Sequence, residues 1–321
     1  MAYQAGTFAD NDDLIDKIDT FLVGQGWTKD NKQVDGTGKR AHFHKTGQFA
    51  STDLYMNFRS AVNEDLDGSL IALTTGIAMN MSEGFSGTGD SWARQGTSYP
   101  GFVSNKAVDN PYAPRMIGIG DTPNQRYFFF HNLNPTVFAI VVEYTPGRYS
   151  WMFGGEIVKL STFTGGQFGS AQWGSETNAG QGINGNEYHP FDRNNGAMNS
   201  FVRADTDVNT VPWQLIEEEA GSNVNRVISA RGFWNDNLLL GPNDFNALAP
   251  LITLPIFAQR PASQYFMLGY IDHVREINLG ALNNEEEITF GSETWKVFPH
   301  RFKGTSGGNT GDLGLAFRKT A

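Results

Sequence analysis

The chain has 321 residues, of which 18% are charged, 13% are aromatic and 37 are glycine; this composition is typical of short strands joined by tight turns and of surfaces buried against partners. The net charge of −10 and the scattered basic residues argue against direct nucleic-acid binding, because nucleic-acid binders present a basic patch to the phosphates. The absence of cysteine excludes disulfides, thiolate catalysis and cysteine-based metal sites.

The N-terminal residues 1–5 lack a basic region followed by an apolar run, so we expect no signal peptide. The longest apolar stretches, such as residues 136–142, are too short for a membrane helix. We therefore expect a soluble protein that is synthesised in the cytoplasm and does not insert into a membrane.

The first predicted element is a helix at about residues 11–23. Apolar residues recur every four positions at Leu14, Ile18 and Leu22. Asp10 or Asn11 can cap the start of the helix, and Gly24 ends it. Period-two alternation follows in residues 54–59, which predicts a half-buried strand. A turn at residues 67–68 then leads into a second strand, so residues 1–80 are expected to form a helix on an antiparallel sheet.

Two histidines of this N-terminal unit, His42 and His44, alternate along the sequence. In a strand both imidazoles point to one face, and a three-fold axis would gather six of them around a metal ion. Two alternating histidines on an exposed strand need no metal, and this simpler interpretation is the one we favour.

A passage rich in Gly, Ser and Pro at residues 82–114 shows no periodicity and is predicted to be a long loop. It carries Trp92 and Tyr99, which we expect to be exposed and to contact neighbouring proteins.

The strongest strand signal lies at residues 127–153. A dense aromatic strand, a β-branched strand and a third short strand are separated by turns at Pro135 and Pro146. Three strands with short turns form an antiparallel meander. With a second irregular loop at residues 165–200, this meander makes up the expected middle unit, residues 81–200.

The remainder, residues 201–321, is expected to form a C-terminal β-rich domain. A brief helix is predicted at residues 212–219 and strands at 265–271 and 288–298, and the alternating Leu313, Leu315 and Phe317 predict a closing strand. The fold class is therefore mainly β, with antiparallel, sandwich-like sheets, a short N-terminal helix and long Gly/Asn-rich loops.

Motifs for catalysis and cofactor binding are incomplete. The run Gly84-Phe-Ser-Gly has the wrong spacing for a nucleophile elbow, and Gly118-Ile-Gly lacks the third glycine of a dinucleotide loop. We expect no catalytic residue, no cofactor and no enzyme activity. Two carboxylates of a glycosidase need not be neighbours in sequence, so glycan hydrolysis stays open as a third hypothesis.

A calcium loop is suggested by Asp205, Asp207 and Asn209, which have the Asp-x-Asp-x-Asn spacing. Thr210 stands where the loop requires glycine, and Ile216 stands where it requires glutamate. A surface turn is therefore the favoured interpretation.

Three parts of the sequence carry a resemblance: YFFFHNLNPTVFAIVVEY and YSWMFGG in the meander, NNEEEITFGSETWKVFPHR near the C-terminus, and GWT after the helix. They resemble uncharacterised virion structural proteins of tailed bacteriophages. The resemblance implies a place in the virion, at the neck, collar or tail, and supplies no catalytic residue.

The first hypothesis is accordingly a virion structural subunit that assembles as a symmetric homo-oligomer and with other virion proteins. The alternative is a receptor- or carbohydrate-binding virion protein of the tail-tip or fibre type, in which Trp and Tyr stack on sugar rings.

Overall fold

The computed structural model describes residues 1–48, 53–64, 74–90, 92, 95–96, 123–160, 168–173, 198–203, 213–215, 226–228, 250–260, 264–300 and 313–320. These residues form antiparallel strands and a single helix, which confirms the predicted mainly β fold. Within these ranges, no helix is long and apolar enough to cross a membrane.

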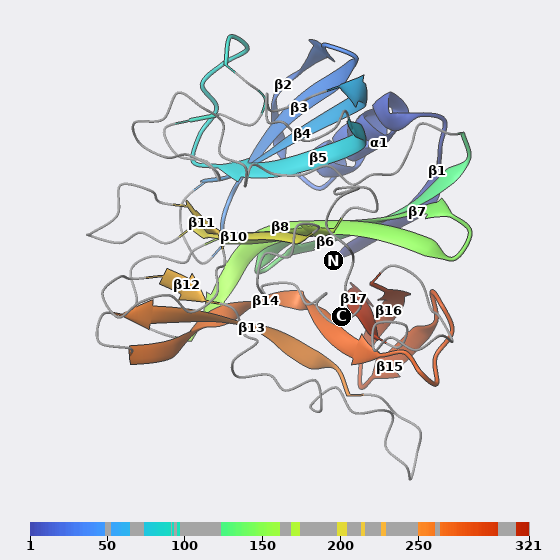
Figure 1. The fold of residues 1–321 in the computed structure, drawn as a ribbon, viewed down its shortest axis with the longest axis vertical. Coiled ribbons are helices and arrows are strands. Elements are labelled where there is room, and N and C mark those ends of the chain that lie inside the picture. Colours follow the sequence, from blue (N-terminus) through green and yellow to red (C-terminus); the bar gives the residue numbers. More distant parts are fainter. Residues whose placement is uncertain are drawn as a thin grey trace.

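Three layers lie one above the other (Figure 1). The upper layer, drawn in blue and cyan, is a four-stranded sheet with the strand order β2-β3-β4-β5. Its strands and the helix beside them are β2 (Thr28–Asp35), β3 (Gly38–Thr46), β4 (Asp53–Glu64), β5 (Thr74–Ser82) and α1 (Asn11–Gly24).

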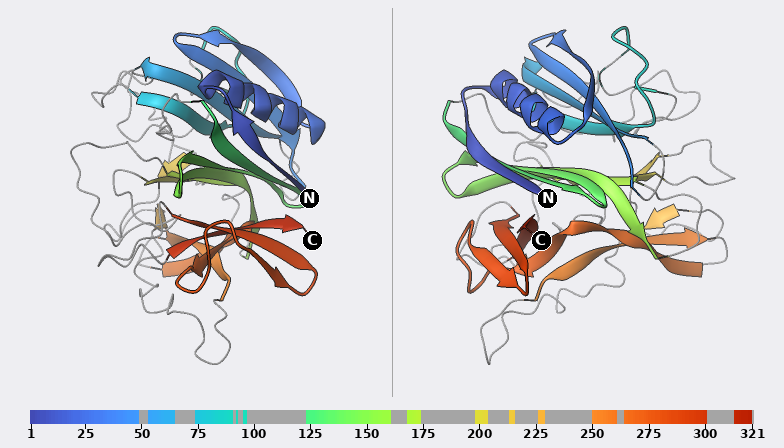
Figure 2. Two further views of the ribbon diagram at one scale, coloured as in Figure 1. Left: turned by 90° about the vertical axis from the view of Figure 1, so that its right-hand side faces the viewer. Right: turned by 180° about the vertical axis from the view of Figure 1, so that it is seen from behind.

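The middle and lower layers belong to one curled sheet of the order β1-β6-β7-β8-β14-β17-β16-β15. The middle layer contains β1 (Ala2–Phe8), β6 (Gln125–Leu133), β7 (Thr136–Thr145) and β8 (Arg148–Lys159). The lower layer contains β13 (Ile252–Arg260), β14 (Gln264–Asn278), β15 (Glu287–Phe290), β16 (Glu293–Pro299) and β17 (Leu313–Thr320) (Figure 2). The predicted three-stranded meander is thus confirmed as β6-β7-β8.

The middle layer is apolar on both faces. Phe128 and Phe130 belong to the core shared with the lower layer, whereas Tyr127 and Phe129 belong to the core shared with α1 and the upper sheet. Successive side chains of a strand point to opposite faces, so a strand buried on both sides needs an unbroken apolar run. This requirement explains the aromatic sequence of β6. Among the large apolar side chains that the structure describes as exposed, Phe290 is the one aromatic.

Strand β8 passes from the middle layer into the lower one. Its residues 151–156 pair with β9 (Phe168–Trp173), and its residues 157–159 pair with β14. Gly155 lies at this transition, where a Cβ atom would be 2.4 Å from the carbonyl oxygen of Thr136. Glycine is needed there because β7 and β8 approach each other closely.

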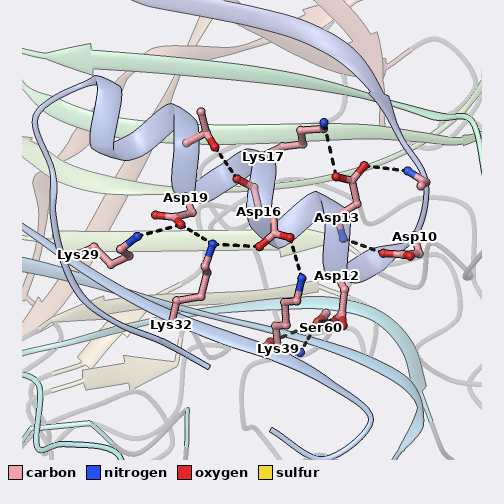
Figure 3. A network of polar contacts seen from close by, with 12 residues as sticks. Asp10, Asp12, Asp13, Asp16, Lys17, Asp19, Lys29, Lys32, Lys39 and Ser60 are labelled. Atoms are coloured by element: carbon pink, nitrogen blue, oxygen red, sulfur yellow. Dashed lines mark hydrogen bonds and ion pairs between the residues drawn. The ribbon is translucent and has the colours of Figure 1, made fainter. Parts of the chain in front are cut away.

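Helix α1 begins as predicted and ends one residue later than predicted, with Gly24 as its last residue and Gln25 as the C-cap. Asp10 is the N-cap, and its side chain accepts a hydrogen bond of 2.7 Å from the backbone N–H of Asp13. The apolar stripe of α1 is buried in the upper core. Its opposite side carries carboxylates that pair with lysines of β2 and β3, including Asp16 with Lys39 at 2.6 Å (Figure 3). The buried apolar stripe and the ion pairs with β2 and β3 together determine how the helix lies on the sheet.

Two local predictions are wrong. Residues 165–200 were expected to be irregular, but β9 lies there, and β10 (Met198–Arg203) begins there. Residues 212–219 were expected to include a helix, but β11 (Trp213–Leu215) is a strand that pairs with β10. In both cases pairing with the preceding strand, β8 for β9 and β10 for β11, overrides the local propensity. The last short strand, β12 (Arg226–Ile228), pairs with β13.

The larger sheet includes strands from all three expected units. β1 pairs with β6, and β14 pairs with β8. The predicted division of the chain into three units, with boundaries at residues 80 and 200, stays a prediction.

Candidate binding pocket

The upper sheet has a polar outer face, opposite the face that packs on the core. Phe58 of β4 belongs to the core cluster, whereas its neighbours Asn57 and Arg59 lie on the other side, opposite His42 and Arg40 of β3. All four polar side chains are buried. Buried polar groups need hydrogen-bond partners, so the segment that covers this face must supply them.

The covering segment follows β5 directly, and its described residues are 83–90, 92 and 95–96 (Figure 1, teal). The ring of Phe85 lies 5.0 Å from the ring of His42. The buried Gln95 accepts a hydrogen bond from the backbone of Ser86 at 3.0 Å, which holds the segment in a closed turn. The segment therefore supplies both an apolar cover and internal polar contacts.

Arg40 ties the covering segment to the sheet. Its Nη1 donates to the carbonyl oxygen of Asp90 at 2.7 Å, and its Nη2 donates to the carbonyl oxygen of Thr88. On the sheet side, the amide oxygen of Gln33, turned toward Arg40, accepts from Nη2 at 2.6 Å. The guanidinium is thus held between β2 and the segment by several directed bonds.

Arg59 is held in the same way by carboxylates. Its Nη2 lies 2.8 Å from Glu64, and its Nε lies 3.2 Å from Asp35. Glu64 also accepts from the backbone and the hydroxyl of Thr37, at 3.0 and 2.6 Å. Burial opposes the ionisation of Glu64, but the Thr37 hydrogen bonds and the charge of Arg59 lower its pKa below the ordinary value. The Glu64 carboxylate is therefore charged at neutral pH and holds Arg59 in place.

A cavity of about 370 Å³ lies between the sheet and the covering segment. It is lined by Gln33, Asp35, Arg40, Arg59, Glu64, Trp92 and residues 88–90. This volume falls within the range of about 300–1,000 Å³ that small-molecule sites occupy. The lining is unusually polar for such a site, and it carries charges of both signs.

Neither of the predicted histidines, His42 and His44, lines this pocket. Nδ1 of His42 lies 2.7 Å from Oδ1 of Asn57, and burial lowers the pKa of His42. Nδ1 of His44 lies 2.8 Å from Asp30, and its ring lies 5.2 Å from that of Tyr55. In the ranges that the structure describes, no three His, Asp or Glu side chains are arranged to hold a metal ion.

The expected exposure of Trp92 is wrong. The side chain is 3% exposed and packs on Ala61 and Ala78, so it lines the pocket instead of forming an outer contact surface. The small residues on β4 and β5 leave the room that the indole fills. The other predicted contact residue, Tyr99, and the predicted calcium ligands Asp205, Asp207 and Asn209 lie outside the described residues.

The pocket was missed from the sequence because its residues look like an ordinary solvated strand face. Arg59 and Asn57 alternate with apolar residues in β4, as polar residues do on any half-buried strand. Only the return of residues 88–90 and 92 over that face turns it into a cavity.

The comparisons with known proteins add no family: no family model matches the chain, and no curated protein matches its sequence.

Proposed function

We propose that the protein is a structural subunit of a tailed-phage virion, at the neck, collar or tail, which acts by assembling with itself and with other virion proteins. The virion setting rests on the sequence resemblance of the meander and the C-terminal strands. The mode of assembly rests on one feature of the fold: among the strands that the structure describes, β1 is paired on one side only.

Strand β1 ends the order of the larger sheet and pairs with β6 over residues 2–8. Its sequence, AYQAGTF, contains no charge and no proline, and its pairing with β6 has no register shift. Ala5 and Thr7 are exposed on it. An edge strand of this length without protection is a template for a strand of another chain.

Two of the other edge strands, β2 and β15, are protected in the usual ways. β2 carries four charged residues and a register shift between Lys29 and Asn31. β15 is only four residues long. Because soluble proteins protect the edges that must stay free, the contrast between β1 and these strands supports β1 as the assembly edge.

The proposal is tested in particles. The change is Ala5→Lys, which places a charge beside the free edge without altering a buried group. We expect mass spectrometry of purified particles to detect the wild-type chain in a fixed ratio to the major tail protein. The variant should reach less than about a tenth of the wild-type ratio. A tenfold loss corresponds to roughly 1.4 kcal/mol of binding free energy. Equal incorporation of the variant would contradict assembly through β1, and absence of the wild-type chain from the particles would contradict the virion setting.

A further inference from the structure

We propose that β1 pairs with β1 of a second copy of this chain, antiparallel and centred on Ala5. The inference rests on the proposed assembly through β1, and it names the partner strand, its direction and its register. Among the strands that the structure describes, β1 pairs with β6 alone, over residues 2–8. The side of β1 that faces away from β6 therefore presents backbone N–H and C=O groups with which a strand of another molecule can pair.

Two-fold symmetry restricts the register of such a pair. When a strand pairs antiparallel with its own copy, the residue on the symmetry axis lies opposite its own counterpart, and the contact is self-complementary. Centring on Ala5 pairs all seven residues of β1, whereas centring one residue earlier or later pairs only five of them. The register centred on Ala5 therefore uses the whole strand.

On the lower face, this register sets a large side chain opposite a small one. Ala5 and Thr7 are exposed, whereas Tyr3 is half-buried and its ring centroid lies 5.2 Å from that of Phe130 in the lower core. Thr7 of one copy lies opposite Tyr3 of the other, and Ala5 lies opposite Ala5. An aromatic ring opposite a β-branched side chain is a favourable cross-strand pair, and two alanines at the axis allow close approach.

The upper face is complementary in size as well. The ring of Tyr127 lies over Gly6, where a Cβ atom would be 2.8 Å from the Tyr127 hydroxyl, and that hydroxyl accepts a hydrogen bond of 2.7 Å from Nε2 of Gln4. Gln4 of one copy lies opposite Gly6 of the other, so a long side chain meets a residue that has none. Phe8 likewise lies opposite Ala2.

The pairing brings no like charges together. β1 has no charged side chain, so two copies can approach along this strand although each chain carries a net charge of −10. A strand of a different protein could also satisfy the backbone groups of β1. The complementarity of β1 with itself on both faces favours a second copy as the partner.

The test uses single cysteines, because the chain has none of its own. Ala5→Cys and Thr7→Cys change exposed positions on one face of β1, and Thr28→Cys changes an exposed position on β2. The full chain of each variant is incubated with oxidised glutathione, and disulfide-linked dimers are quantified by non-reducing electrophoresis. Opposed residues of antiparallel strands have Cα atoms about 4.5–5.5 Å apart, which a disulfide spans. In the proposed register, Thr7 lies about 14 Å from its own counterpart, which is too far.

We expect Ala5→Cys to form the linked dimer at least about tenfold faster than Thr7→Cys or Thr28→Cys, because opposed thiols have an effective concentration far above that of the protein in solution. Thermal unfolding checks that each variant is folded. If Ala5→Cys does not fold, a mixture of Tyr3→Cys with Thr7→Cys decides the register. The mixture should form the linked dimer, and each of the two variants alone should form little of it.

Equal rates for the three single variants would overturn the inference, and so would faster cross-linking of Thr7→Cys than of Ala5→Cys. If the wild type nevertheless forms an oligomer that Thr7→Lys abolishes, only the inference fails, and assembly through β1 stands with another partner or register. If Ala5→Cys cross-links as expected but the chain is absent from purified particles, the self-pairing stands and the virion proposal fails.

Discussion

His131 is the residue whose burial has the clearest measurable consequence. It is 2% exposed and lies where α1 ends against the meander, and its Nε2 accepts a hydrogen bond of 2.9 Å from the indole of Trp27. Burial, assisted by the positive charges of Lys45 and the N-terminal amino group, lowers its pKa from 6.5 to about 3. The folded protein therefore holds this imidazole neutral, whereas the unfolded chain protonates it below about pH 6.5.

The contribution of the neutral His131 to the stability of the folded protein is fully present above pH 6.5 and is lost as the pH falls toward 3. Between pH 7 and pH 5 the loss is about 2 kcal/mol, because one pKa unit corresponds to about 1.4 kcal/mol. His131→Gln keeps an acceptor for Trp27 but does not titrate. We will compare the free energies of unfolding of the wild type and the variant, measured with urea. We expect the wild type to lose about 2 kcal/mol relative to the variant as the pH falls from 7 to 5. A difference that stays constant with pH would refute the buried neutral histidine.

At the scale of elements, the turn between β2 and β3 depends on one glycine. Gly36 has a φ of +56°, and a Cβ atom there would lie 2.3 Å from Oε1 of Glu64. Gly36→Ala should therefore displace the carboxylate that holds Arg59, in addition to straining the backbone, and we expect a loss of about 1–3 kcal/mol in the free energy of unfolding.

The matched control is Gly24→Ala at the end of α1, where nothing lies within 4 Å of an added Cβ atom. It should leave the stability unchanged or raise it by up to about 1 kcal/mol. Equal losses for the two substitutions in chemical denaturation would contradict this account of the turn.

Elements whose pattern is complete within their own sequence could be predicted, and those that depend on a partner strand could not. The spacing of Leu14, Ile18 and Leu22 and the Asp10 cap define α1 within the sequence itself. The meander could be predicted because the turns between its strands are marked in the sequence by Pro135 and Pro146. β9 and β11, in contrast, exist through partners in β8 and β10, and no short-range signal marks them. The pocket was not predicted because its walls come from separate segments: residues 88–90 and 92 supply one wall, and the side chains of β2 to β4 supply the other, namely Gln33, Asp35, Arg40, Arg59 and Glu64.

For the whole molecule, the shared middle layer makes the two cores depend on each other. Phe129 lies in the upper core and Phe128 in the lower one, both fully buried in the same strand. We expect Phe129→Ala and Phe128→Ala each to lower the stability by about 3–5 kcal/mol. Unfolding should stay a single transition by circular dichroism and by fluorescence, because loss of either core disrupts β6.

Phe290→Ala is the control for these substitutions, since this phenylalanine is 39% exposed. Its effect should stay within about 0.5 kcal/mol, as for surface substitutions in general. Two separate transitions in Phe129→Ala, with the lower core still folded, would show that the layers are independent units.

The central claim is that the molecule acts by assembly through β1, and sedimentation velocity of the isolated protein tests it most directly. Thr7 on β1 and Thr28 on β2 are both exposed threonines on edge strands, so Thr7→Lys and Thr28→Lys form a matched pair. We expect the wild type and Thr28→Lys to form the same concentration-dependent oligomer. Thr7→Lys should remain monomeric at concentrations at least about tenfold higher, because a lysine on an edge strand blocks strand addition. A wild type that stays monomeric throughout, or a Thr7→Lys variant that assembles like Thr28→Lys, would contradict the claim.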